Sequence, residues 1–192
     1  MQKLTHADLY TLEAYARERP VFRTRVLEHK KARIVHVGDH VTLVFEDRLT
    51  VQYQIQEMLR VERIFEAAGI AEELEAYNPL IPDGANLKAT MLIEYPDADL
   101  RARKLLELHD IENRVTLQVG DLAPIAAIAD EDLERSTDTK TAAVHFLRFE
   151  FDAAQLAAFG RAEVAIAIDH PAYRARSVLT PATREALARD FA

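Results

Sequence analysis

The sequence predicts an α+β domain, with a largely antiparallel mixed sheet packed with helices and an N-terminal helical pair. Alternating strand-like segments are interleaved with amphipathic helical segments, but the two types do not strictly alternate. Two Gly-Asp dipeptides also separate apolar runs, as the turns of antiparallel hairpins do. We therefore expect a single domain over residues 1–192, with a possible weak joint at the turn-rich segment 78–86.

The expected helices combine apolar periodicity with capping or helix-breaking residues at their ends. Thr5 and Pro20 would open the two helices of the N-terminal pair, and Asp97 and Thr180 are N-caps of later helices. Gly69 would stop the longest helix. The expected helices cover residues 6–19, 20–31, 47–65, 71–77, 97–110, 152–160 and 181–191.

The expected strands are short runs with apolar residues on at least one face. The segment TAAVHFLRFEF is the most regular of them, and Pro96 ends the strand expected at 87–95. Pro124 weakens the second hairpin, because proline cannot donate to a strand ladder. The expected strands cover residues 33–37, 40–46, 87–95, 114–119, 122–129, 141–151 and 163–169, and the chain is expected to continue extended over 170–179.

Composition and motifs exclude several classes of protein. The chain has no Cys, so it cannot form disulfides or cysteine-held iron–sulfur clusters, and this fits a cytoplasmic protein. A net charge of −8 argues against nucleic-acid binding, and no apolar run approaches the roughly 20 residues that span a membrane. Glycine-rich phosphate loops, G-x-S-x-G and Glu-x-x-His are also absent, so no cofactor is firmly predicted.

One stretch departs from the acidic balance of the chain. Residues 17–33 contain seven Arg or Lys and two Glu, which gives this stretch a net charge of +5. It is either a solvated helix face that contacts acidic neighbours in the same fold, or a docking patch for an acidic partner or a phosphate. The candidate partner-binding residues are Arg17, Arg19, Arg23, Arg25, Lys30 and Lys31.

An acidic residue interrupts the apolar stripe of the helix expected at 47–65. At about 100° per residue the apolar side chains share one broad face, and Glu62 falls near its middle. A buried carboxylate needs a partner or loses its charge. Unless the helix has a different phase, Glu62 is expected to pair with an arginine such as Arg148 or Arg114, or to be a protonated acid or a metal ligand.

Two histidines lie on the apolar faces of expected strands. His145 shares its face with aromatic residues of TAAVHFLRFEF, and His170 ends the apolar row of EVAIAIDH. If these strands are antiparallel neighbours, as their short connection favours, the two imidazoles come close together. With Glu62, or with Glu94 near another strand end, they would bind Zn, Fe or Mn. The alternative is two core histidines that hydrogen-bond to the backbone or to Asp169.

Several stretches together resemble an uncharacterised bacterial family, domain of unknown function 3501. They are FEDRLTVQYQIQEMLRVERIF, IPDGANLKAT, VHFLRFEF and IDHPAY, and the resemblance extends over nearly the whole chain. The resemblance implies that the gene lies beside genes for rubrerythrin and for iron–sulfur or flavin-linked oxidoreductases, and so implies a setting in peroxide and electron-transfer metabolism. It implies no catalytic residue. Without Cys or Glu-x-x-His, this chain is not itself the rubrerythrin-like or cluster-bearing partner.

Two functions from different classes are therefore open. The first is a cytoplasmic accessory or regulatory protein that binds a redox partner such as rubrerythrin, with the basic stretch at 17–33 as the contact. The second is a metal-dependent enzyme or metal-binding protein that uses His145, His170 and a carboxylate. A homodimer is a third option, because the helix at 47–65 is apolar on two sides and could bury one of them against a second copy.

Overall fold

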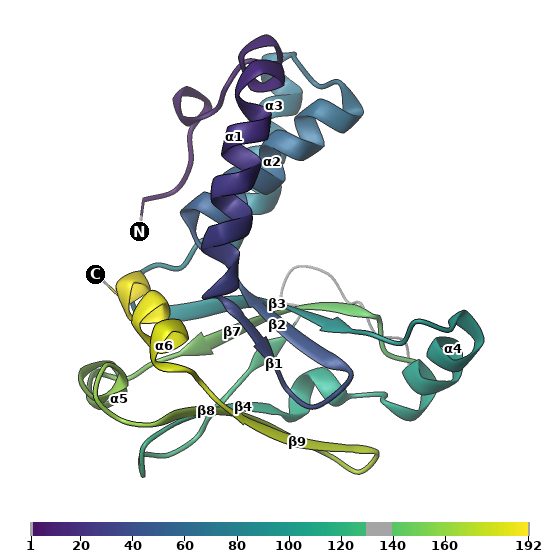
Figure 1. Ribbon diagram of the computed structural model, residues 1–192, viewed down its shortest axis with the longest axis vertical. Helices are drawn as coiled ribbons and strands as arrows, with labels where there is room; N and C mark the ends of the chain where they lie inside the picture. Colours follow the sequence, from purple (N-terminus) through teal and green to yellow (C-terminus); the bar gives the residue numbers. More distant parts are fainter. Residues whose placement is uncertain (1, 130–139, 192) are drawn as a thin grey trace.

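The computed structural model describes residues 2–129 and 140–191. Two sheets face each other across the main hydrophobic core, and a bundle of three N-terminal helices projects from them (Figure 1). The α+β class is confirmed, and every strand pair among the described residues is antiparallel. The division of the strands into two sheets was not visible in the sequence.

The two sheets, called sheet A and sheet B below, have strand orders β1-β2-β3-β7-β6 and β5-β4-β8-β9. Sheet A comprises β1 (Ile34–His36), β2 (Val41–Phe45), β3 (Asn86–Ile93), β7 (Val144–Glu150) and β6 (Ile128–Ala129). Sheet B comprises β5 (Ile125–Ala126), β4 (Val115–Val119), β8 (Val164–His170) and β9 (Tyr173–Val178).

The core lies between the sheets because each long strand of sheet A turns one apolar face inward. Every second residue of β3 and β7 is buried, and Met91 and Phe149 are fully enclosed. Leu117 and Ile166 belong to the matching face of sheet B. Burial of a large apolar side chain contributes roughly 1.5–3 kcal/mol, so this interface is the main source of stability.

Hydrogen bonds also connect the sheets at one edge. The hydroxyl of Tyr173, on β9, donates to the carbonyl of Val37 at 2.6 Å and accepts from the backbone N–H of His40 at 3.1 Å. Ser177 of the same strand donates to the carbonyl of His36 at 2.5 Å. Gly38 in the turn between β1 and β2 has a φ of 71°, and a Cβ there would lie 2.5 Å from the Tyr173 hydroxyl.

The helices cover the ends and one face of this sandwich. They are α1 (Leu12–Lys31), α2 (Arg48–Glu62), α3 (Ala67–Tyr77), α4 (Ala98–Glu107), α5 (Ala153–Phe159) and α6 (Pro181–Ala188). Short 3-10 turns are η1 (His6–Asp8), η2 (Asn78–Leu80), η3 (Ile111–Arg114) and η4 (Arg189–Phe191). The N-caps expected at Asp97 and Thr180 are confirmed, since each side chain accepts a backbone N–H of the first turn.

The helix break expected at Pro20 is absent, because α1 continues through this residue. Its N-cap is Thr11, whereas Thr5 precedes the separate turn η1. Proline removes one backbone hydrogen bond from a helix interior. Tyr15 and Phe22, on either side of Pro20, are buried against α2, so tertiary packing outweighs the local preference.

The bundle of α1, α2 and α3 stands on the outer face of sheet A (Figure 1). Inside it, Val51, Ile55 and Leu59 of α2 pack against Ile70 of α3 and against Leu4. The segment 78–86, expected to be a weak joint, connects α3 to β3. Among the residues that the structure describes, no helix has both the length and the apolar character needed to cross a bilayer.

Candidate functional site

Glu62 is exposed, so the expectation of an acid buried in the apolar stripe of α2 is wrong. The buried stripe of α2 ends at Leu59, and the helix ends at Glu62, after which Arg63 takes a left-handed conformation with φ 57°. Because the helix ends here, a step of 100° per residue does not describe where the side chains after Glu62 point. The two arginines expected as its partners form ion pairs with other acids, Arg114 with Asp110 and Arg148 with Glu150.

We expect Glu62→Gln to change the free energy of unfolding by no more than about 0.5 kcal/mol, because the carboxylate is solvated. Glu57→Gln on the same helix is the matched contrast. Hydrogen bonds from Arg19 lower the pKa of Glu57 to about 2, so its neutralisation should cost about 1–2 kcal/mol. Urea denaturation measures the free energy of unfolding of both variants. A decrease above about 1 kcal/mol for Glu62→Gln would show that Glu62 is buried after all.

His170 is a core histidine with both ring nitrogens hydrogen-bonded. Its Nε2 lies 2.9 Å from the carbonyl oxygen of His109, and its Nδ1 accepts the backbone N–H of Ala172 at 3.1 Å. This assigns the proton to Nε2 and leaves no lone pair for a metal. The side chain therefore fits the alternative reading, in which it bonds to the backbone.

His145 is fully buried on β7, in sheet A, whereas His170 belongs to β8 in sheet B. The expectation that their strands are neighbours is therefore wrong. The Nε2 of His145 lies 2.7 Å from Thr141 Oγ1 and 3.8 Å from Glu112 Oε2. Thr141 Oγ1 in turn donates to Glu112 Oε2 at 2.8 Å. The segment 109–112 is therefore contacted by His170 from sheet B and, through Thr141, by His145 from sheet A.

The fourth candidate metal ligand, Glu94, lies exposed just beyond β3. Its carboxylate accepts a hydrogen bond from Thr42 Oγ1 at 2.5 Å. Within residues 2–129 and 140–191, no three His, Asp or Glu side chains are grouped as a metal site requires. The structure therefore gives no geometric support for binding of Zn, Fe or Mn by His145, His170, Glu62 and Glu94.

The basic residues of α1 have different environments. Arg23 and Arg25 are exposed, and neither forms an ion pair with any residue that the structure describes. Lys30 is half-buried and lines a cavity. The other three candidates form ion pairs within the fold, Arg17 with Glu13, Arg19 with Glu57 and Lys31 with Glu28.

This cavity, called the interlayer cavity below, has a volume of about 300 Å³ and lies between the helical bundle and sheet A. Its floor consists of side chains that point away from the main core. Val44, Thr90 and Phe146 stand opposite one another on β2, β3 and β7, and Leu92 stands opposite Val144. All five are only half-buried, so the floor is an apolar surface with a single hydroxyl.

The helical bundle forms the opposite wall of the interlayer cavity, which is partly open to solvent. Val51 and Gln54 of α2, Tyr77 at the end of α3 and Leu80 of η2 contribute to this wall, and Lys30 of α1 lies at one side. Apolar walls with a few polar groups are typical of small-molecule sites, whose volumes are about 300–1,000 Å³.

Glu46 is the buried polar group of this cavity. It follows β2 directly and is only 8% exposed. Its Oε2 accepts a hydrogen bond from Thr50 Oγ1 at 2.6 Å, and its Oε1 accepts one from Thr90 Oγ1 at 2.8 Å. Because the two hydroxyls come from α2 and β3, they fix the carboxylate between the bundle and the sheet.

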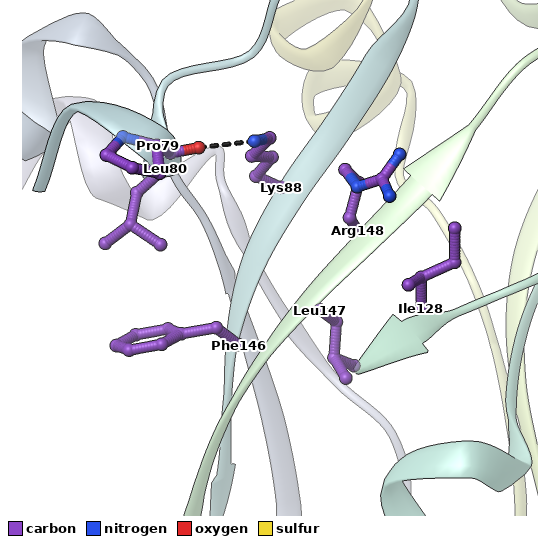
Figure 2. A pocket seen from close by; sticks show the side chains of 7 residues that line it. All are labelled: Pro79, Leu80, Lys88, Ile128, Phe146, Leu147 and Arg148. Carbon is purple, nitrogen blue, oxygen red and sulfur yellow. Dashed lines mark hydrogen bonds between the residues drawn. The ribbon is translucent and has the colours of Figure 1, made fainter. Parts of the chain in front are cut away.

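The floor becomes charged further along the same strands. Lys88 and Arg148 are cross-strand neighbours on β3 and β7, and Figure 2 shows them beside a small hollow of about 50 Å³ that adjoins the interlayer cavity. Lys88 donates to the carbonyl of Pro79, and Arg148 pairs with Glu150. Like charges directly opposite are unfavourable, and these partners compensate for that cost.

A second cluster of charges lies at the base of α1. Arg33 is 1% exposed and donates to two backbone carbonyls at the end of β2, at 3.0 and 3.1 Å. It also pairs with Asp190 near the C-terminus, and its Nη1 lies 3.4 Å from Asp47 Oδ2. His29 Nε2 lies 2.5 Å from the same oxygen of Asp47. An adjoining hollow of about 520 Å³ is lined mainly by charged side chains. Two of them, Glu28 and Arg189, pair with Lys31 and Glu185 outside the lining.

The two carboxylates of this cluster shift in opposite directions. Burial raises the pKa of Asp190 to about 6, and the charge of Asp47 adds to this rise while Arg33 opposes it. Burial acts on Asp47 too, but Arg33, the backbone N–H of Thr50 and His29 together hold its pKa below the usual value. The cluster ties the C-terminal segment to α1 and α2, which is a structural role.

Glu46, Asp47 and Asp190 were not predicted as site residues from the sequence. One signal was available for the first two, because two acids stand directly between the apolar strand VTLVF and a helix. Asp190 gave none, since its partner Arg33 is 157 positions away.

Comparisons with known proteins agree with this architecture. A crystal structure described as a novel protein of unknown function from Burkholderia pseudomallei K96243 has 50% sequence identity, covers 100% of both chains and gives a TM-score of 0.95. No curated protein matches the sequence. Residues 3–191 match the family described as "Protein of unknown function (DUF3501)", in agreement with the resemblance found in the sequence. The chain therefore belongs to the DUF3501 family.

Proposed function

We propose that this protein is a cytoplasmic accessory binding protein whose ligand site is the interlayer cavity. The observation that supports the proposal is an apolar cavity of about 300 Å³ with a fixed, buried carboxylate at Glu46. In an otherwise apolar pocket, a small number of polar groups serves mainly to orient the bound ligand. The proposed ligand is therefore a small amphipathic molecule.

Burial of the cavity floor would supply much of the binding energy. Val44, Leu92, Val144 and Phe146 are half-buried although the bundle covers them. Each CH₂ group that a ligand buries there contributes roughly 0.8 kcal/mol. An apolar body would lie over these side chains, with its polar group near Glu46.

An uncharged naphthalene dye with polarity-sensitive emission tests this site. We expect one dye per chain to bind wild-type protein with a blue shift, as in an apolar environment. Val144→Phe enlarges a floor residue and should weaken the binding by about tenfold or more in a fluorescence titration.

The matched control is Val178→Phe, the same substitution at a 47% exposed position on β9. Its dye affinity should stay within about twofold of wild type. Unchanged dye binding in a correctly folded Val144→Phe variant would contradict the site, as would an equal loss in both variants.

Docking to a redox protein is a second candidate function, which the family resemblance suggests. It is favoured by Arg23 and Arg25, which are exposed on α1 without ion pairs to described residues. At low salt we expect a complex with rubrerythrin, or with an oxidoreductase encoded by a neighbouring gene, and this complex should weaken as the salt concentration rises. Arg23→Glu combined with Arg25→Glu should abolish the complex, whereas Arg103→Glu on α4 should leave it intact. Failure to form a complex at low salt would rule out this docking function.

A further inference from the structure

The polar end of the interlayer cavity favours one class of ligand. Glu46 is more than nine-tenths buried, and its hydrogen-bond donors are the neutral hydroxyls of Thr50 and Thr90. No Arg, Lys or His among the described residues forms an ion pair with its carboxylate. A buried negative charge without a counter-ion is unfavourable, and a cation placed beside it removes that cost.

Lys30 is the other charged residue that lines the cavity, and it could attract an anion instead. It lies in the last turn of α1 and is half-buried, and its amine forms no hydrogen bond to a described residue. A lysine amine on a flexible stem can turn toward solvent. The carboxylate of Glu46 is held by two hydrogen bonds, and a preorganised group contributes more to selectivity than a mobile one.

We propose that the ligand is a primary amine with an apolar tail, recognised through an ion pair between its ammonium group and Glu46. The inference rests on the proposed function and names its ligand class. Each carboxylate oxygen accepts one hydroxyl and keeps a lone pair for an ammonium N–H. The tail lies on the apolar floor formed by Val44, Leu92, Val144 and Phe146.

Three probes with the same tail test the head group: n-octylamine, n-octanol and n-octanoate, each in competition with the naphthalene dye. On wild-type protein, n-octylamine should bind about tenfold or more tightly than the other two, because charge-assisted hydrogen bonds are the strongest kind available there. This comparison needs no variant. Binding that is equal for the three probes, or tightest for n-octanoate, would overturn the amine assignment.

Substitutions then assign the preference to a residue. Glu46→Gln keeps the size of the side chain and removes its charge, so n-octylamine should fall to within about threefold of n-octanol. Glu75→Gln, at an exposed position on α3, removes the same charge and should leave the preference unchanged. Lys30→Met should leave n-octylamine bound as tightly or more tightly.

The outcomes separate this inference from the proposed function. Unchanged n-octylamine preference in Glu46→Gln, or n-octanoate binding that Lys30→Met abolishes, would refute the amine and keep the cavity as a binding site. If neither the dye nor any of the three probes binds, the proposed function itself fails.

Discussion

Replacing Arg33 by methionine is expected to lower the free energy of unfolding by about 3–5 kcal/mol. Arg33 is 1% exposed, and its guanidinium compensates the charges of Asp190 and Asp47. Methionine fills a similar space but leaves both carboxylates without their arginine in a poorly solvated region. Breaking one side of a buried ion pair is costly because the stranded charge remains.

Urea denaturation at neutral pH measures this loss. Arg25→Met is the matched control on α1, since Arg25 is exposed, and it should change stability by no more than about 0.5 kcal/mol. The double variant Arg33→Met/Asp190→Leu removes a charge from each side and should recover part of the loss. If Arg33→Met unfolds altogether, Arg33→Lys should still show an intermediate loss. Equal stability of the Arg33 and Arg25 variants would refute the account of this cluster.

Stability is expected to decrease as pH rises from about 4 to about 7, through the titration of Asp190. Burial raises the pKa of this carboxyl from 3.8 to about 6, so the folded state holds the proton more tightly than the unfolded state does. Its stabilising contribution is complete below about pH 3.8 and is lost as the pH passes through about 6. A shift of this size corresponds to about 3 kcal/mol.

Asp47 acts in a different pH window. Because its pKa is lowered in the folded state, its contribution is present above about pH 3.8 and is lost only at lower pH. Asp190→Asn should therefore flatten the dependence between about pH 4 and 7, whereas Asp169→Asn, at an exposed position, should leave it unchanged. Urea denaturation across this range would contradict the assignment if wild type and Asp190→Asn gave parallel curves.

Elements with strong local signals were predictable from the sequence. The caps at Asp97 and Thr180 and the strand 144–150 depend on neighbours within a few residues, and all three are found in the structure. Pro20 shows the limit, because long-range packing of α1 against α2 keeps the helix intact there. The two-sheet arrangement was not predictable, since it depends on which distant strands pair, such as β4 with β8.

The candidate site was harder to predict for the same reason. Glu62 is the last residue of α2, and there a small error in the predicted helix end changes a buried position into an exposed one. In the sequence, Arg33 belongs to a basic stretch that is typical of a solvated surface. Its partner Asp190 is distant in the sequence and is brought to it by the fold. Glu46 and Thr90 are likewise far apart in the sequence and meet through the pairing of β2 with β3.

The most direct test of the interlayer cavity is an NMR titration of the isotope-labelled 21.7 kDa chain with the naphthalene dye. We expect saturable shift changes concentrated in residues 44–46, 90–92 and 144–146, with β8 and β9 of sheet B unaffected. Changes concentrated on sheet B, or unsaturable changes spread over the surface, would contradict the claim that this cavity is the binding site.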